Sequence, residues 1–211
     1  MRISLICGFA ALAMVSGSAA HAQNLLSNAS FEDPVVADGP PFVGSFEAFS
    51  GGAGAGSGNS TSTPRTGAMS LELSIAGINN TFAGAFQDVV GLTAGSSVVF
   101  SGFQMTPSSP NGVASEFRIE FRNSTTAAEI SRVQLTSGPT GPTYTQFSVP
   151  AIVPVGADTA RVVYAIQTFG GEPAPGDTGI VRLDDFSFVV VPEPTTLAAL
   201  GAAGLLLRRR R

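Results

Sequence analysis

The chain has 211 residues and a formal net charge of −4 at pH 7, and its only cysteine, Cys7, and only histidine, His21, lie in the first 22 residues. Residues 23–191 contain six arginines, no lysine and fourteen carboxylates, which gives this segment a net charge of −8. This composition excludes disulfides within 23–191, argues against nucleic acid as a partner, and favours hard cations such as calcium, which take oxygen ligands.

The first 22 residues have the pattern of an export signal. Met1-Arg2 is a short positive region, an apolar run spans 3–15, and Ala20-His21-Ala22 has the small-x-small form that signal peptidase cuts. We expect cleavage between Ala22 and Gln23. An internal membrane helix is the alternative interpretation, but a run of this length at ~1.5 Å per residue does not cross about 30 Å of hydrocarbon.

Short runs of alternating apolar and polar residues, separated by turn residues, dominate 23–191. In 115–122, for example, Phe117, Ile119 and Phe121 alternate with charged side chains. This pattern predicts one all-β domain over 23–191, an antiparallel β-sandwich of the jelly-roll type, between the signal peptide (1–22) and a C-terminal tail (192–211) with a hydrophobic helix. The predicted strands are 24–31, 68–75, 82–90, 96–105, 115–122, 128–135, 144–149, 161–168 and 179–191.

Residues 50–63 are almost entirely Gly, Ala, Ser, Thr and Asn. Such a segment buries too little apolar surface to offset its ordering entropy, and it is predicted to be a mobile surface loop. The alternative is a loop that grips a glycan, preceded by Phe42, Phe46 and Phe49.

The C-terminus has three parts: Val191-Pro192-Glu193-Pro194, an apolar run over 195–207, and the cluster Arg208, Arg209, Arg210 and Arg211. The prolines stop the last strand, and the arginines act as a cytoplasmic stop. These features resemble the PEP-CTERM sorting signal, which implies an exosortase-type processing enzyme as a partner and a transient anchor in the inner membrane. Such tails also occur on ice-binding proteins, but the regular threonine array that ice binding predicts is not found.

Four further segments resemble carbohydrate-binding-module-like jelly rolls, which are related to the galactose-binding domain fold. They are 24–32 (NLLSNASFE), 65–71 (RTGAMSL), 91–100 and 181–188 (VRLDDFSF). The resemblance implies that the first and last strands lie side by side and that a structural calcium ion lies near their ends. Glu32 and Asp184 would be side-chain ligands and Asp185 a third, with carbonyls near Ser30 and around Thr66 or Ala68, since calcium takes six to eight oxygens.

An alternative without a metal is open for the same acidic residues. Glu32 and Asp33 would then cap a turn, while Asp184 and Asp185 would form a bulge or pair with Arg182. Adjacent aspartates on a regular strand face opposite ways, so both reach one ion only if a bulge re-aims one of them.

Catalysis is disfavoured by the side chains that are missing. Without histidine, cysteine or lysine in 23–191, a histidine-based triad, a cysteine nucleophile and a Schiff base are excluded. Glu116 and Glu120 lie on one face of a predicted strand, roughly 13 Å apart at ~3.3 Å per residue, which is too far for glycoside hydrolysis. Their alternation with Arg118 and Arg122 predicts a solvated, charge-paired face.

The sequence therefore predicts a non-catalytic exported protein that is sorted by its tail to the cell surface or an exopolysaccharide matrix. A carbohydrate-binding protein with a defined glycan ligand is the alternative. The chain has no tryptophan and two tyrosines, and the candidate ligand-binding residues are Tyr144 and Phe42. Tyr164, between Val163 and Ala165, is expected in the core.

Overall fold

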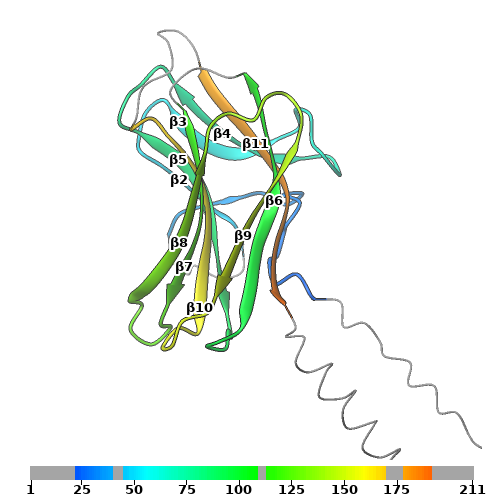
Figure 1. Cartoon of the computed structure of the whole chain (residues 1–211). Helices are drawn as coiled ribbons and strands as arrows, with labels where there is room; N and C mark the ends of the chain where they lie inside the picture. Colours follow the sequence, from blue (N-terminus) through cyan, green and yellow to red (C-terminus); the bar gives the residue numbers. More distant parts are fainter. Residues whose placement is uncertain (1–21, 40–44, 109–112, 170–177, 192–211) are drawn as a thin grey trace, which may run out of the picture.

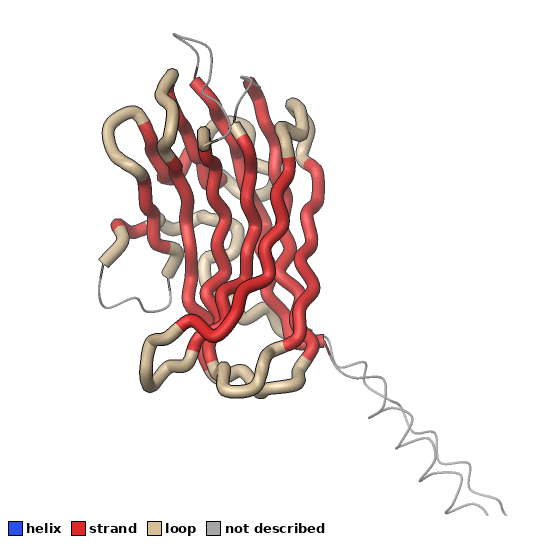
Figure 2. The backbone as a smooth tube through the Cα atoms, turned by 60° about the vertical axis from the view of Figure 1, so that its left-hand side comes forward, coloured by secondary structure: helices blue, strands red, loops and turns tan. Residues whose placement is uncertain are grey.

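The computed structural model describes residues 22–39, 45–108, 113–169 and 178–191. These residues form eleven strands in two facing sheets, and they include no helix. Figures 1 and 2 show the strands running along the long axis of the molecule, with loops gathered at its two ends. The predicted all-β sandwich is confirmed.

Sheet A has six strands in the order β1-β2-β5-β10-β7-β8, and sheet B has five in the order β3-β4-β11-β6-β9. Strands β1 and β2 are parallel, and all other neighbouring strands are antiparallel. The strands of sheet A are β1 (Val36–Ala37), β2 (Glu47–Ser50), β5 (Phe82–Val90), β7 (Ala114–Arg122), β8 (Glu129–Ser137) and β10 (Thr159–Gln167). Those of sheet B are β3 (Ala55–Ser60), β4 (Ser70–Ala76), β6 (Ser97–Ser108), β9 (Thr145–Ile152) and β11 (Thr178–Val191).

Eight of the nine predicted strands are present, and the prediction of a strand over 24–31 is wrong. This segment does lie beside the last strand, because the Leu25 amide donates to the Phe188 carbonyl (2.8 Å) and the Phe186 amide donates to the Ala29 carbonyl (2.8 Å). Asn28 and Phe31, however, have left-handed backbones with φ of 48° and 57°. These two conformations interrupt a regular ladder.

The prediction of a mobile loop over 50–63 is also wrong, because β3 lies within it. Strand β3 pairs with β4 from Ala55 opposite Ile75 to Ser60 opposite Ser70, and all six of its residues are half-buried. The entropy argument considered side-chain burial alone. An edge strand of small residues is held instead by its backbone hydrogen bonds to a neighbour.

The core is built from phenylalanines on the inner faces of both sheets. The Phe186 ring lies at its centre, with centroid distances of 5.0 Å to Phe31, 5.3 Å to Phe100 and 5.4 Å to Phe147, each close to perpendicular. Tyr164 is fully buried, as expected, and its hydroxyl donates from sheet A to the Gln104 side chain of sheet B. This contact ties the two sheets together inside the core.

Strand β11 carries a bulge between Asp184 and Ser187 that brings Phe186 to this position. Gly102 of β6 lies against it, and a Cβ on Gly102 would overlap the Phe186 ring and come within 2.9 Å of Phe147. Because β6, β9 and β11 approach one another closely at this point, position 102 requires a glycine.

We expect Gly102→Ala to destabilise the domain by about 1–3 kcal/mol, because an added methyl group overpacks a filled core. The measurement is the free energy of unfolding in urea. Gly138→Ala is the control, since its Cβ would meet nothing within 4 Å. Equal stabilities for the two variants would contradict the packing described here.

Candidate functional site

The outward face of sheet A carries about half of the charged side chains among the described residues, and several aromatic ones. Its central rows are set by register: Arg161 of β10 lies between Glu120 of β7 and Asp88 of β5, and Val163 lies between Arg118 and Phe86. Because side chains on one face alternate with period two, these residues share the outer surface.

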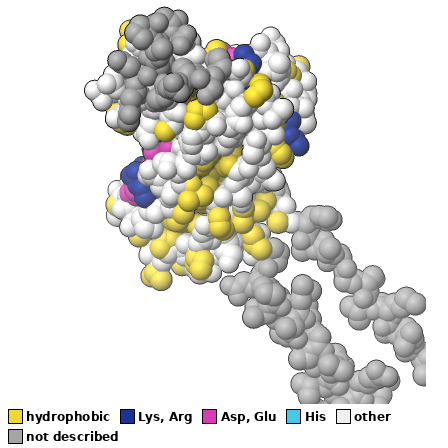
Figure 3. Space-filling model, turned by 45° about the horizontal axis from the view of Figure 1, so that its top comes forward, with side chains coloured by type: hydrophobic (Ala, Val, Ile, Leu, Met, Phe, Trp, Pro, Cys, Tyr) yellow, Lys and Arg dark blue, Asp and Glu magenta, His cyan; other side chains and the backbone are white. Residues whose placement is uncertain are grey.

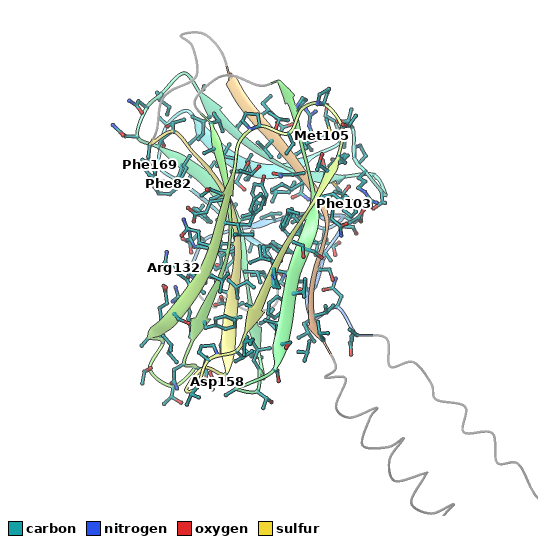
Figure 4. The ribbon with its side chains drawn as sticks, viewed as in Figure 1. Phe82, Phe103, Met105, Arg132, Asp158 and Phe169 are labelled. Atoms are coloured by element: carbon teal, nitrogen blue, oxygen red, sulfur yellow. The ribbon has the colours of Figure 1, made fainter. Side chains whose placement is uncertain are left out.

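Four phenylalanines follow one another along this face, and we call them the aromatic strip: Phe169, Phe82, Phe49 and Phe86. Successive ring centroids are 6.4, 5.9 and 6.1 Å apart. Phe82 and Phe169 are 36% and 57% exposed, and Figure 4 shows them side by side at the edge of the molecule. Phe86 is buried beneath the Arg161 guanidinium, which lies 3.9 Å from the ring centroid.

Phe49 lies flat on the sheet because β5 has a glycine beneath it. A Cβ on Gly84 would overlap the Phe49 ring and come within 2.7 Å of the Tyr164 carbonyl. In the sequence Phe82-Ala83-Gly84-Ala85-Phe86, the two phenylalanines and the glycine face outward and the two alanines face the core. Gly84 therefore leaves room between the two rings on the outer face, which Phe49 fills.

A cleft of about 410 Å³ opens between the aromatic strip and the charged rows. A second cleft of about 390 Å³ continues past Phe49 and Ser50 toward β1 and β3. The first is lined by Asp38, Phe49, Ser50, Phe82, Phe86, Arg118, Glu120, Arg122, Arg161 and Val163. We call the two together the sheet A groove, which crosses the strands and is in the size range of small-ligand sites.

Ion pairs organise the charged side of the groove. Arg118 bridges Glu116 and Glu120, its Nε donating to Glu120 (2.6 Å), and Arg122 donates to the other oxygen of Glu120. Arg161 makes a two-point contact with Asp88 (2.7 and 2.8 Å). In the space-filling view, the visible charged side chains are few and form no large patch of one sign (Figure 3).

The prediction that this face is charge-paired is confirmed, but the prediction that it is solvated is wrong for the glutamates. Glu116 and Glu120 are only 6% and 3% exposed, because the arginine stems and neighbouring strands cover them. Burial opposes ionisation of Glu120, yet hydrogen bonds from Arg122 and Arg118 outweigh it and hold the pKa of this carboxyl below its ordinary value.

The predicted calcium ligands converge on the loop 65–69. Asp184 is fully buried and accepts hydrogen bonds from the amides of Arg65 (2.8 Å) and Thr66 (3.1 Å). Glu32 accepts from the amides of Ala68 (3.0 Å) and Met69 (3.2 Å). The structure thus brings Glu32 and Asp184 to one loop, as the family resemblance implies.

The contacts of Asp185 differ from those of Glu32 and Asp184. It pairs with the Arg65 guanidinium and accepts from the Thr66 hydroxyl (2.6 Å), while Arg182 pairs with Glu72 rather than with either aspartate. The bulge that the metal-free alternative included is present. No group of three or more acidic, histidine or cysteine side chains is placed to hold a metal within the described residues, so calcium here would need main-chain oxygens beside Glu32 and Asp184.

Burial raises the pKa of Asp184, against three backbone hydrogen bonds that lower it. Both Asp184 oxygens accept amide hydrogen bonds, which satisfy the buried carboxylate without a metal. Carboxylate oxygens are nevertheless the ligand type that calcium takes, and an ion here would share the oxygens of Asp184 and Glu32 with these amides.

The remaining predicted site residues are dispersed. Tyr144 is half-buried directly before β9, on the sheet B side, and its hydroxyl donates to the Thr63 carbonyl (3.1 Å). Ala22 and Gln23 are exposed, and Val191 is the last residue of β11. Phe42, the signal up to residue 21, and the tail residues Pro192 to Arg211 lie outside the described residues. No helix among the described residues is long and apolar enough to cross a membrane.

Comparison with protein families identifies a sorting signal at the C-terminal end of the sequence. Residues 190–211 match the PEP-CTERM protein-sorting motif. This motif implies an exported protein that is anchored transiently by its C-terminus and processed by an exosortase. No curated protein matches the sequence.

Solved structures share the fold at low identity. The enzymatically active domain of tailspike protein 4 from bacteriophage CBA120 superposes with a TM-score of 0.59 at 14% identity, covering 80% of this chain but 21% of that one. TmCBM61, solved with β-1,4-galactotriose, gives 0.51 at 13% identity over 80% and 99% of the two chains. The CBM22-1 xylan-binding domain from Paenibacillus barcinonensis Xyn10C gives 0.53 at 16% over 83% and 99%. The chain thus has the β-sandwich fold of carbohydrate-binding modules.

We expect Glu120→Gln to lower the free energy of unfolding by about 1–3 kcal/mol at pH 7, because it leaves Arg122 without a charged partner and leaves Arg118 with Glu116 alone. The folded pKa of Glu120 lies below its unfolded value, so the contribution is present above the unfolded pKa and lost as the pH falls through the folded one. The difference between wild type and variant should therefore shrink in acid.

Urea unfolding at a series of pH values checks this. Glu129→Gln is the matched control, since the Glu129–Arg132 pair is more exposed and worth at most about 1 kcal/mol. A difference for Glu120→Gln that stays constant from neutral to acid pH would contradict the assignment.

Proposed function

We propose that this is a non-catalytic exported protein that binds a polysaccharide of the cell surface or exopolysaccharide matrix in the sheet A groove. The observation that carries the proposal is the groove itself, in which a partly exposed aromatic strip borders a row of hydrogen-bonding charged groups. Sugars have flat apolar faces and polar edges, and a site for them needs both kinds of surface.

The aromatic strip supplies the apolar surface. Phe82 and Phe49 line the groove directly, and Phe169 extends the strip beyond it. The two clefts share Phe49 and Ser50 as lining residues, so together they offer a ligand more room than the first cleft alone, which suits a chain of sugar residues better than a free monosaccharide.

The charged rows supply hydrogen bonds without strong net charge. Their arginines and carboxylates are held in place by one another, so they need little reordering when a ligand binds. Arg118, Arg122 and Arg161 line the groove, and guanidinium N–H groups can donate to sugar hydroxyls.

The same network supports a binding role rather than hydrolysis. Glycoside hydrolysis needs one protonated and one ionised carboxyl group facing the sugar. Glu120 is held ionised by two arginines, and Arg118 also occupies Glu116. Structural neighbours such as TmCBM61 and the CBM22-1 domain, which are described as glycan-bound or glycan-binding, add support for carbohydrate as the ligand class.

We expect Phe82→Ala and Phe49→Ala each to weaken binding of the responsive polysaccharide at least about tenfold, which corresponds to about 1.4 kcal/mol for loss of one aromatic contact. A glycan array identifies the polysaccharide, and isothermal titration calorimetry measures the affinities.

Tyr144→Ala and Phe42→Ala are the comparison variants, because these were the residues that the sequence favoured. Tyr144 lies on the other sheet, so its loss should leave the affinity unchanged. Loss of binding in Tyr144→Ala with none in Phe82→Ala would move the site away from the groove, and a flat array would overturn the proposal.

We further propose that calcium binds between Glu32 and Asp184 and fastens the start of the chain to β11. Both carboxylates reach the 65–69 loop, and they come from the two ends of the domain sequence. An ion at this place would stabilise the fold without taking part in binding at the groove, which lies on the other sheet.

Calcium should raise the midpoint of thermal unfolding by about 5–10 °C at a hundredfold excess over its dissociation constant, compared with a chelator. Asp184→Ala should abolish this rise. Asp33→Asn, which removes an exposed charge next to Glu32, should keep it. A midpoint that does not respond to calcium in the wild-type protein would exclude the ion.

A further inference from the structure

Exposed aliphatic side chains gather at one end of the sandwich, which we call the lower end. It is formed by the loops 91–96, 123–128 and 153–158, and Figure 4 shows Asp158 there. Among the described residues, the three most exposed large hydrophobic side chains are Val155 (90%), Val90 (72%) and Ile152 (67%). All three belong to the lower end.

Hydrogen bonds hold these loops in place. The Val153 amide donates to the Ser96 carbonyl (3.0 Å), and the Gly95 amide donates to the Val153 carbonyl (2.8 Å). Asn123 Nδ2 donates to the Gly156 carbonyl (3.0 Å), which ties the third loop to the second. The backbone that carries the exposed side chains is therefore ordered by hydrogen bonds, and their exposure is a property of the fold.

The described chain also begins and ends at the lower end. Val191 pairs with Ser97, and Ser97 pairs with Ile152, so strand spacings of about 4.8 Å put Val191 roughly 10 Å from Ile152. The segment that begins at Ala22 runs antiparallel to β11, with Leu25 bonded to Phe188, and it starts beside the end of that strand (Figure 1). Both hydrophobic segments of the sequence are thus attached at this end.

The distance to the tail is short. Only Pro192, Glu193 and Pro194 separate Val191 from the apolar run that starts at Thr195. Even a fully extended backbone spans at most about 14 Å between these two residues. When the run is in a bilayer, the lower end is therefore held within reach of the headgroup region, which is about 5–7 Å thick on each side.

The three loops of the lower end carry almost no charge, although the domain as a whole is acidic. They contain one ionisable side chain, Asp158, which accepts hydrogen bonds from the Ser124 amide (2.7 Å) and hydroxyl (2.6 Å). Arg122 and Glu129 lie in the same row of sheet A as Val90, but each is held in an ion pair with a residue of the opposite charge. A surface of this kind has little electrostatic attraction to lipid headgroups and little repulsion from them. Contact with lipid would come from its aliphatic side chains.

We infer that the lower end is a membrane-contact surface, on which Val90, Ile152 and Val155 enter the interfacial region while the tail anchors the chain. Three valine- or isoleucine-sized side chains bind a bilayer weakly by themselves, but a tether makes the contact intramolecular and raises its effective concentration. The contact then fixes the domain upright on the membrane. This inference is independent of any glycan ligand.

The test uses the chain from Gln23 to Arg211, with its tail, in phosphatidylcholine vesicles recovered by flotation. This chain has no cysteine, so Ala94→Cys at the lower end and Ala76→Cys at the opposite end each give one site for a fluorescent label. Brominated phosphatidylcholine should quench the label at residue 94 at least about threefold more than the label at residue 76, with no change when salt or anionic lipid is added.

A second comparison separates lipid contact from mere tethering. Val90→Ser, Ile152→Ser and Val155→Ser are combined in the Ala94→Cys chain, and these exposed positions should not affect folding. Quenching at residue 94 should fall to the level of residue 76. Equal quenching at the two labels overturns the inference, as does quenching at residue 94 that survives the triple substitution. Protection of residue 94 only when a second protein is added would also overturn it.

Discussion

The bulge at Asp184–Ser187 in β11 is the constraint on which the sandwich depends. Side chains of a strand alternate between faces, so one extra residue moves every later side chain to the opposite face. Val181 and Leu183 face the core before the bulge, and Phe186 and Phe188 face it afterwards. The left-handed backbone of Asp185 (φ 49°) makes the shift. A regular strand would turn Phe186 toward solvent and remove the centre of the aromatic core.

This core leaves the outer face of sheet A free for another role. The rings that hold the sheets together point inward, and Tyr164 with Gln104 provides a polar tie between them. The outer face instead holds a network of ion pairs and partly exposed rings. The clefts beside this network are the place where we propose that the ligand binds.

The sequence was informative where a local pattern carries the structure. Alternation in Phe117-Arg118-Ile119 predicted a strand and which of its side chains face the core. Turn residues predicted where most of the other strands begin and end. It failed at β3, where Gly56 and Gly58 have no side chain to alternate, so pairing with β4 left no trace in composition. The aromatic strip was missed for a different reason: Phe49, Phe82 and Phe169 are far apart in sequence, and only strand order brings them together. Convergence of Glu32 and Asp184 followed instead from a family resemblance.

The sheet A groove and the lower end also have a fixed relation to each other. The groove crosses β7, β10, β5 and β2 and is lined from Phe82, at the start of β5, to Arg122, which lies in the same row as Val90, whereas the lower end lies where β5, β7 and β10 begin or end. A domain that stands on the lower end holds its strands upright, so the Arg122 end of the groove lies nearer the membrane and the Phe82 end lies farther from it. The polysaccharide that we propose as the ligand would then cross the domain close to the bilayer. Release of the tail removes this alignment but not the groove, so an exosortase-processed domain keeps its binding surface while losing its orientation.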